Sequence, residues 1–118
     1  MLCKAKVLLG SKSGRSIGFP TVNLDPRIII DTYKEGIYAS QVKYGGKIYL
    51  GALYLGPRLV KGEKNTILEI HILDFKKEIY GEEIEFEVGK FIREIMDFKT
   101  MEELKSQIEK DIEIISSS

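Results

Sequence analysis

The spacing of apolar residues changes once along this chain, and that change restricts the fold more than any other feature of the sequence. Between residues 36 and 88 the apolar positions follow the two-residue period of β-strands, most clearly in residues 82–88, where they alternate with glutamates. After Thr100 they recur every three or four residues, as on one face of a helix, and Thr100 with Glu103 forms a capping box. Strands followed by one terminal helix predict an antiparallel barrel with the helix packed on its outside or across one end.

The pattern divides the chain into short strands and one helix within a single expected domain, residues 1–118. The expected strands are residues 4–9, 36–44, 47–55, 66–75 and 82–88, with a brief one at 28–30, and the helix covers about residues 100–115. Gly45-Gly46 is a two-residue hairpin signal. The fold class is therefore mainly all-β, with the barrel over about residues 3–90.

Composition excludes several classes of protein. Hydrophobic residues make up 43% and charged residues 31% of the 118 residues, as in ordinary globular domains. A formal net charge of zero argues against a nucleic-acid binder. The lone Cys3 excludes an intramolecular disulfide, and no apolar run approaches the roughly 20 residues of a membrane span. We expect a cytoplasmic monomer with neither nucleic acid nor membrane as a partner.

Residues 10–24 combine glycines, cations and hard oxygen atoms directly after an apolar run. Glycines let backbone N–H groups approach an anion closely, and Lys12 and Arg15 add positive charge. Thr21 and Asn23 are two residues apart, so in an extended segment their oxygens project to the same side. Oxygen ligands beside a phosphate site suit Mg²⁺. The alternative is a flexible basic loop that leads into a strand.

The strand expected at residues 66–75 places Glu69 and His71 on the face opposite its aliphatic side chains. Partial burial would raise the pKa of a carboxyl at position 69 and make it a better general base near neutral pH. On periodicity alone, however, both residues also fit the solvated side of an edge strand. A lone histidine on a strand is more typical of a hydrogen-bonded structural residue, and one Cys with one His leaves no zinc site.

The chain resembles the riboflavin kinases of bacteria and eukaryotes from about residue 7 to residue 112. Residues 14–23 match their Gly-Arg-x-x-Gly-Phe-Pro-Thr-x-Asn run, with valine at the usual alanine position, and residues 69–75 match their Glu-x-His-x-Leu-Asp-Phe run. The resemblance implies a six-stranded Greek-key barrel closed by the C-terminal helix. It also implies transfer of the ATP γ-phosphate to the 5′-hydroxyl of riboflavin, giving FMN and ADP.

The resemblance also implies roles for individual residues. Glu69 would be the catalytic base, Thr21 and Asn23 would bind Mg²⁺, and the partners would be the small molecules ATP and riboflavin. The nucleotide-binding residues would be Gly10, Lys12, Gly14, Arg15, Gly18, Pro20, Thr21 and Tyr80. The flavin-binding residues would be Phe91, Arg93 and Phe98. A planar guanidinium can hydrogen-bond to or stack on a flavin ring, although Arg93 as a plain surface cation is the alternative.

The sequence departs from the family pattern at two places. Residues 54–60 keep the glycine and arginine of Asn-Ile-Gly-x-Arg-Pro-Thr but place tyrosine, leucine and valine at the asparagine, proline and threonine positions. Ile95 stands where the family has a glutamate, with Glu94 beside it. These changes bear on flavin binding more than on phosphate chemistry. They motivate a first alternative, a flavin-binding or regulatory module with little turnover. A second, an oligonucleotide-binding barrel, is opposed by the zero net charge and the acidic face of residues 82–88.

Overall fold

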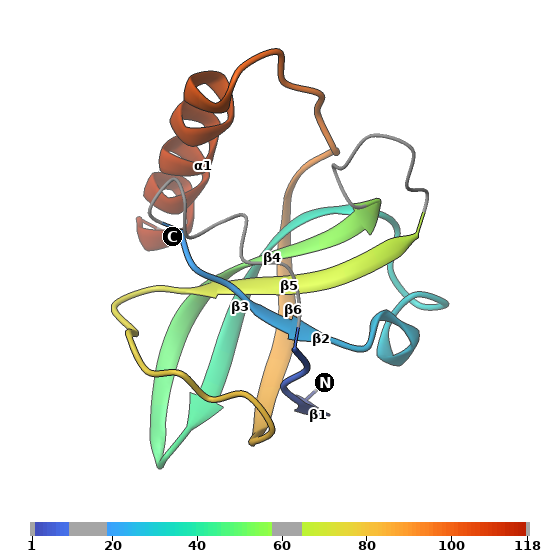
Figure 1. The fold of residues 1–118 in the computed structure, drawn as a ribbon, viewed down its shortest axis with the longest axis vertical. Helices are drawn as coiled ribbons and strands as arrows, with labels where there is room; N and C mark the ends of the chain where they lie inside the picture. Colours follow the sequence, from blue (N-terminus) through green and yellow to red (C-terminus); the bar gives the residue numbers. More distant parts are fainter. Residues whose placement is uncertain (1, 10–18, 58–64, 118) are drawn as a thin grey trace.

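The computed structural model describes residues 2–9, 19–57 and 65–117. Their strands form one antiparallel six-stranded sheet in the order β1-β6-β3-β4-β5-β2 (Figure 1). The strands are β1 (Leu2–Lys6), β2 (Val22–Leu24), β3 (Gly36–Tyr44), β4 (Lys47–Pro57), β5 (Thr66–Ile72) and β6 (Glu83–Arg93). The chain then forms the helix α1 (Met101–Ser116), which lies beside the curled sheet in Figure 1.

The sheet curls far enough for its two edges to touch. Just beyond β1, the backbone N–H of Leu8 donates to the carbonyl oxygen of Asn23 at 2.7 Å, and the two residues form a bridge between the sheet's edge strands. Strands β3, β4 and β5 run as a meander, and β6 returns to lie beside β3, which is the Greek-key order. The expected antiparallel Greek-key barrel with a C-terminal helix is confirmed.

Alternation places the core as the sequence predicts. On β5, Leu68 and Ile70 are fully buried, whereas Glu69 and His71 face the other way and are half-buried. The helix α1 packs on β4 from outside the barrel and buries Asp111 and Ile115. Its N-terminus is capped as expected.

Two hydrogen bonds cap the start of the helix. The Thr100 hydroxyl accepts from the backbone N–H of Glu103 at 3.1 Å, and the Glu103 carboxylate accepts from the N–H of Lys99. Among the described residues, no helix is long and apolar enough to cross a bilayer.

The strand expected at residues 28–30 is wrong. Pro26–Ile28 forms a short 3₁₀ helix, η2, whose N-cap Asp25 accepts from the N–H of Arg27. Only Ile29 of the apolar run enters the core, because a 3₁₀ turn directs its neighbours Ile28 and Ile30 toward solvent. The sixth strand is β2 instead, three residues that follow directly on Thr21.

Other bounds shift by a few residues. β1 begins and ends earlier than expected, because the chain leaves β6 after Lys6 to reach Asn23. β6 continues five residues past Val88, through a register irregularity opposite β3. At Gly89 an added Cβ would lie 2.8 Å from the Ala39 carbonyl oxygen, so only glycine fits this close approach.

Candidate functional site

One row of side chains crosses the outer face of the sheet from β2 to β6. Asn23 lies directly opposite Glu69, and Glu69 directly opposite Tyr54. The row continues through Ile37 to Arg93. Directly opposed residues of antiparallel strands share a face, with Cβ atoms about 4.5–5.5 Å apart. One residue from each of five strands is therefore gathered on one surface, and Glu69 is near one end of the row.

The segment that contains Thr21 and Asn23 is held to the sheet on both sides. β2 pairs with β5, and the Asn23 carbonyl accepts from Leu8. Val22 and Leu24 pack toward the core, so Asn23 projects outward beside Glu69. By the same alternation Thr21, which is half-buried, lies on the Asn23 side. The structure thus places Asn23 directly opposite the predicted base, with Thr21 two residues before it on the same side.

His71 contacts the same segment. Its Nδ1 lies 2.8 Å from the Pro20 carbonyl oxygen, and its ring meets the Phe19 ring edge-on with centroids 5.4 Å apart. These contacts fit the structural role expected for this histidine. They also place Pro20, a predicted nucleotide-binding residue, two positions along β5 from Glu69.

Glu69 does not lie on an edge strand. β5 pairs with β4 along its whole length and with β2 around Glu69, so the edge-strand alternative is wrong. The side chain is half-buried between Asn23 and Tyr54. A carboxylate in that position can accept a proton or a hydrogen bond from a group bound on the outer face.

Tyr54 is a neighbour of Glu69 that the sequence marks as a departure from the family pattern but not as a site residue. Its hydroxyl donates to the Pro57 carbonyl oxygen. Burial, together with the negative charges of Glu69 and Glu35, raises the pKa of Tyr54 to about 12, while Arg93 acts in the opposite direction.

The two departures from the family pattern meet in space. An added Cβ on Gly56 would lie 2.8 Å from Cδ1 of Ile95 and 3.3 Å from the hydroxyl oxygen of Tyr54. The side chains of Tyr54 and Ile95 therefore both lie beside Gly56, although 41 positions separate them in the sequence. A larger residue at position 56 would have to displace the end of the Ile95 side chain.

The raised pKa of Tyr54 predicts a loss of stability in alkali. The unfolded phenol loses its proton near pH 10 and the folded one only near 12, so the free energy of unfolding falls as pH rises between these values. The fall should reach about 2.7 kcal/mol, for two pKa units at about 1.36 kcal/mol each. Urea denaturation at several pH values should show a shallower fall for Tyr54→Phe than for wild type or for Tyr80→Phe at an exposed site. Identical pH dependence in all three would contradict the assignment.

Arg93 is engaged by the helix. Its Nε and a terminal nitrogen donate to the Asp111 carboxylate at 2.9 and 2.8 Å, and the other terminal nitrogen donates to the Glu94 carbonyl. Gln107 also donates to Asp111. The Arg93 and Asp111 side chains are only 16% and 4% exposed. The arrangement joins β6 to α1, and the surface-cation alternative for Arg93 is wrong.

The remaining aromatic candidates separate into different places. The Phe98 ring centroid lies 5.9 Å from Cζ of Arg93, so these two predicted flavin residues are neighbours. Phe91 instead packs against the core, edge-on to Tyr38, away from the face of Glu69. Tyr80 is 61% exposed in a turn whose next residue, Gly81, donates its N–H to the Val7 carbonyl. Tyr80 therefore lies close to Val7, which precedes the glycine-rich segment by three positions in the sequence.

Five predicted nucleotide-binding residues, Gly10, Lys12, Gly14, Arg15 and Gly18, lie outside the described residues. Within the described ranges, no three His, Cys, Asp or Glu side chains form a group that could hold a metal ion. The hydroxyl oxygen of Thr21 and the amide oxygen of Asn23 are nevertheless donors that Mg²⁺ accepts when substrate phosphates complete its shell. The donor set fits this ion.

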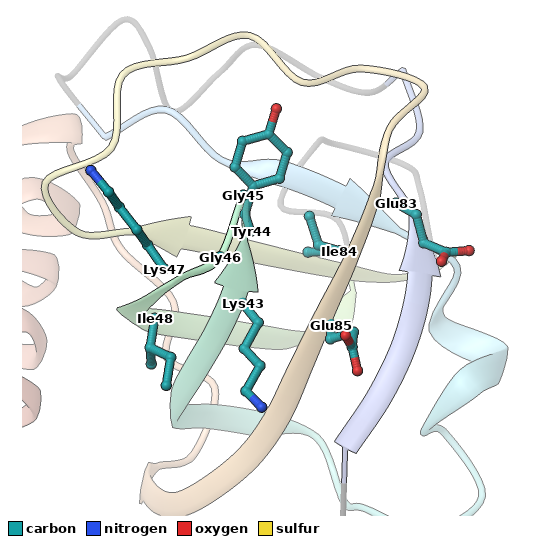
Figure 2. Close-up of a pocket in the computed structure, with 9 residues that line it drawn as sticks. All are labelled: Lys43, Tyr44, Gly45, Gly46, Lys47, Ile48, Glu83, Ile84 and Glu85. Carbon is teal, nitrogen blue, oxygen red and sulfur yellow. The ribbon is translucent and has the colours of Figure 1, made fainter.

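A pocket of about 460 Å³ lies at the other end of β4 (Figure 2). It is formed by the β3–β4 hairpin and the start of β6, with Lys43, Lys47, Glu83 and Glu85 around it. At about 3.4 Å per residue along β4, Lys47 is roughly 24 Å from Tyr54. None of its lining residues belongs to the row on the outer face, so we do not assign the chemistry to this pocket.

Asp111 is another site residue that sequence reasoning missed. It follows Ile108 by three positions and precedes Ile115 by four, so it falls on the apolar stripe of the helix. An acidic residue on a buried stripe needs a cationic partner, and this requirement could have identified Asp111 from the sequence. For Tyr54 the only signal was its place at the asparagine position of the family pattern, because its position next to Glu69 depends on the register of β4 and β5.

Comparison with known proteins gives a consistent result. The family model Flavokinase, described as riboflavin kinase, matches residues 1–118. A bifunctional riboflavin kinase/FMN adenylyltransferase of Haemophilus influenzae is 38% identical over 109 residues, covering 92% of this chain and 35% of the relative. The RNA-binding riboflavin kinase RibR of Bacillus subtilis is 35% identical, covering 93% of this chain and 47% of that protein. The chain thus spans about a third to a half of these relatives.

Two solved structures share the fold. A Streptococcus pneumoniae structure described as a macrolide-efflux protein has a TM-score of 0.84 and 27% identity, covering 99% of this chain and 38% of the other. Riboflavin kinase from Trypanosoma brucei has a TM-score of 0.69 and 22% identity, covering 98% of this chain and 77% of the other. The second likeness, at this identity, bears on the fold alone.

Proposed function

Because the chain belongs to the riboflavin kinase family, we propose that it transfers the γ-phosphate of ATP to the 5′-hydroxyl of riboflavin, giving FMN and ADP. The observation that carries the proposal is the row Asn23–Glu69–Tyr54, which sets a half-buried carboxylate beside oxygen donors on the outer face of the sheet. Phosphoryl transfer needs this pairing of a charge-neutralising site with a group that orients the attacking hydroxyl.

The row also has a direction that suits the reaction. Attacking and leaving oxygens are roughly in line in phosphoryl transfer, so nucleotide and acceptor approach from opposite sides. From Asn23 to Arg93 the row follows the curved sheet for roughly 19 Å, at about 4.8 Å per strand. We place the ATP phosphates at the Thr21 and Asn23 end and the riboflavin ring toward Arg93 and Phe98. Glu69, between the two, would orient the ribityl hydroxyl and accept its proton.

The metal and the nucleotide would be held by the glycine-rich segment and the strand that follows it. Thr21 and Asn23 would bind Mg²⁺, which when bound offsets the charge of the transferred group. Gly10, Lys12, Gly14, Arg15 and Gly18 would bind phosphates, with Pro20 and Tyr80 at the edge of the nucleotide. Residues 1–118 would act as one unit. The cytoplasmic location, the monomeric state and the lack of a nucleic-acid partner stay predictions.

The test is direct. The purified chain is incubated with riboflavin, ATP and MgCl₂, and FMN and ADP are measured by chromatography, with omission of ATP and addition of EDTA as controls. Equal amounts of FMN and ADP are expected. Quenching of riboflavin fluorescence without FMN formation would instead support the flavin-binding or regulatory alternative. If the chain neither forms FMN nor quenches riboflavin fluorescence, both functions are contradicted.

The metal site gives a separate prediction. Asn23→Ala should strongly lower kcat and raise the Mg²⁺ concentration needed for half-maximal rate, because it removes an oxygen that helps place metal and phosphates. Asn65→Ala, at an exposed position, is the matched control. Thermal melting should be similar for both variants. Wild-type kcat for Asn23→Ala at saturating Mg²⁺ would exclude Asn23 from the site.

A further inference from the structure

The ring of His71 is the point at which β5 holds the segment that leads into β2. Nδ1 contacts the carbonyl oxygen of Pro20, 51 residues away in the sequence, and Phe19 packs on the ring. A carbonyl oxygen can only accept a hydrogen bond, so Nδ1 must carry the proton. This donor exists both in one neutral tautomer and in the imidazolium, so the contact survives protonation of the ring.

The hydrogen bond to the Pro20 oxygen fixes the whole peptide unit between Pro20 and Thr21. The described part of the chain has no cis peptide bond, and a planar trans peptide ties the direction of its carbonyl to that of the next N–H. Because the Pro20 carbonyl points at His71, the Thr21 N–H points away from it. The same plane also sets the position of the Thr21 Cα, from which the hydroxyl projects.

Strand β5 thereby positions both parts of the proposed site, the base and the metal-binding segment. Glu69 and His71 are two residues apart on the same face of β5, about 7 Å along the strand. Glu69 would face the acceptor, while His71 holds the peptide that precedes the metal-binding residues. A shift of that peptide would move Thr21 relative to Glu69 without changing the fold.

We propose that His71 is a positioning residue that fixes the Pro20–Thr21 peptide on β5, so that Thr21 and Asn23 keep their place relative to Glu69. Its catalytic consequence rests on the proposed function. The donor is a nitrogen bonded to Cγ, and only some side chains reproduce it. Asparagine presents an amide nitrogen bonded to Cγ, whereas glutamine presents one at the place of Nε2. His71→Asn should therefore keep the contact, and His71→Gln should lose it.

Steady-state kinetics test the consequence. His71→Gln and His71→Ala should raise the KM for ATP by about threefold to tenfold, the range for loss of one ordinary hydrogen bond. Riboflavin affinity, measured by fluorescence quenching, should stay unchanged. His71→Asn should stay within about twofold of wild type for both substrates. Neither Asn nor Gln keeps the ring contact with Phe19, so the pair isolates the hydrogen bond.

Hydrogen exchange tests the contact without any reaction. The amides of residues 21–23 should exchange faster in His71→Gln than in His71→Asn, which should resemble wild type. If wild type forms no FMN, the proposed function fails and the exchange comparison alone decides on the positioning role. Equal exchange and equal KM for ATP in the Asn and Gln variants would overturn that role even in an active enzyme.

Discussion

Glu69→Gln should lower kcat by about 10²–10⁴-fold, the usual range for loss of a general base. Glutamine keeps the shape of the side chain and one accepting oxygen but cannot take the proton of the riboflavin hydroxyl. Riboflavin binding should change little, since the variant leaves Tyr54, Arg93 and Phe98 in place. The melting temperature should hold or rise, because a half-buried carboxylate is replaced by a neutral group.

Glu87→Gln is the matched control, since Glu87 is an exposed glutamate on β6. Its kcat should equal that of wild type. FMN formation in single-turnover and steady-state experiments, with melting curves for both variants, completes the comparison. Near-normal kcat with a clear loss of stability in Glu69→Gln would show that Glu69 is a structural residue of the strand and that the base lies elsewhere.

Arg93→Ala should lower the free energy of unfolding by about 3–5 kcal/mol, because it leaves the buried Asp111 carboxylate without its cation. Arg27→Ala is the matched control, because it removes the arginine of an exposed ion pair. Arg27 and Asp25 form a pair of nearly the same length, 2.7 Å, but the Arg27 side chain is 87% exposed. That variant should have little effect on stability, since water and salt screen an exposed pair.

Urea denaturation measures the free energy of unfolding of both variants. Asp111→Asn, alone and combined with Arg93→Ala, completes a double-mutant cycle in which the partner of Arg93 is neutral. If Arg93 also binds the flavin, the KM for riboflavin should rise more than the KM for ATP at temperatures where Arg93→Ala remains folded. Equal loss of stability in Arg93→Ala and Arg27→Ala would mean that burial does not strengthen the Arg93–Asp111 pair.

Several elements follow from local pattern alone. β3 was predicted to the residue, and β5 and β6 were predicted with the correct faces, because one side of each strand is buried and its apolar residues must alternate. The helix was predicted from its stripe and its cap, which are local interactions. The site candidates Thr21, Asn23 and Glu69 also came from sequence, through their donor chemistry and their match to the family motifs.

Local sequence pattern gave the wrong secondary structure where a segment distant in the sequence decides it. β2 has three residues and no periodicity of its own, and it is a strand because Leu68–Ile70 of β5 pairs with it. The run Ile28–Ile30 resembles a strand but places a single side chain in the core from a 3₁₀ turn. In each case the deciding contacts come from residues distant in the sequence, which a local window does not include.

By itself, the amino-acid sequence determined the two periods of the chain, the family to which it belongs and the chemistry of the candidate residues. Only the tertiary structure decided which of them are neighbours. The register of β2, β5 and β4 places Asn23 and Tyr54 on either side of Glu69, and the docking of α1 gives Arg93 its partner Asp111. The physical reason is that a one-residue change of register would move every side chain of a strand to the other face. That register is set by the packing of the whole barrel and not by any single segment.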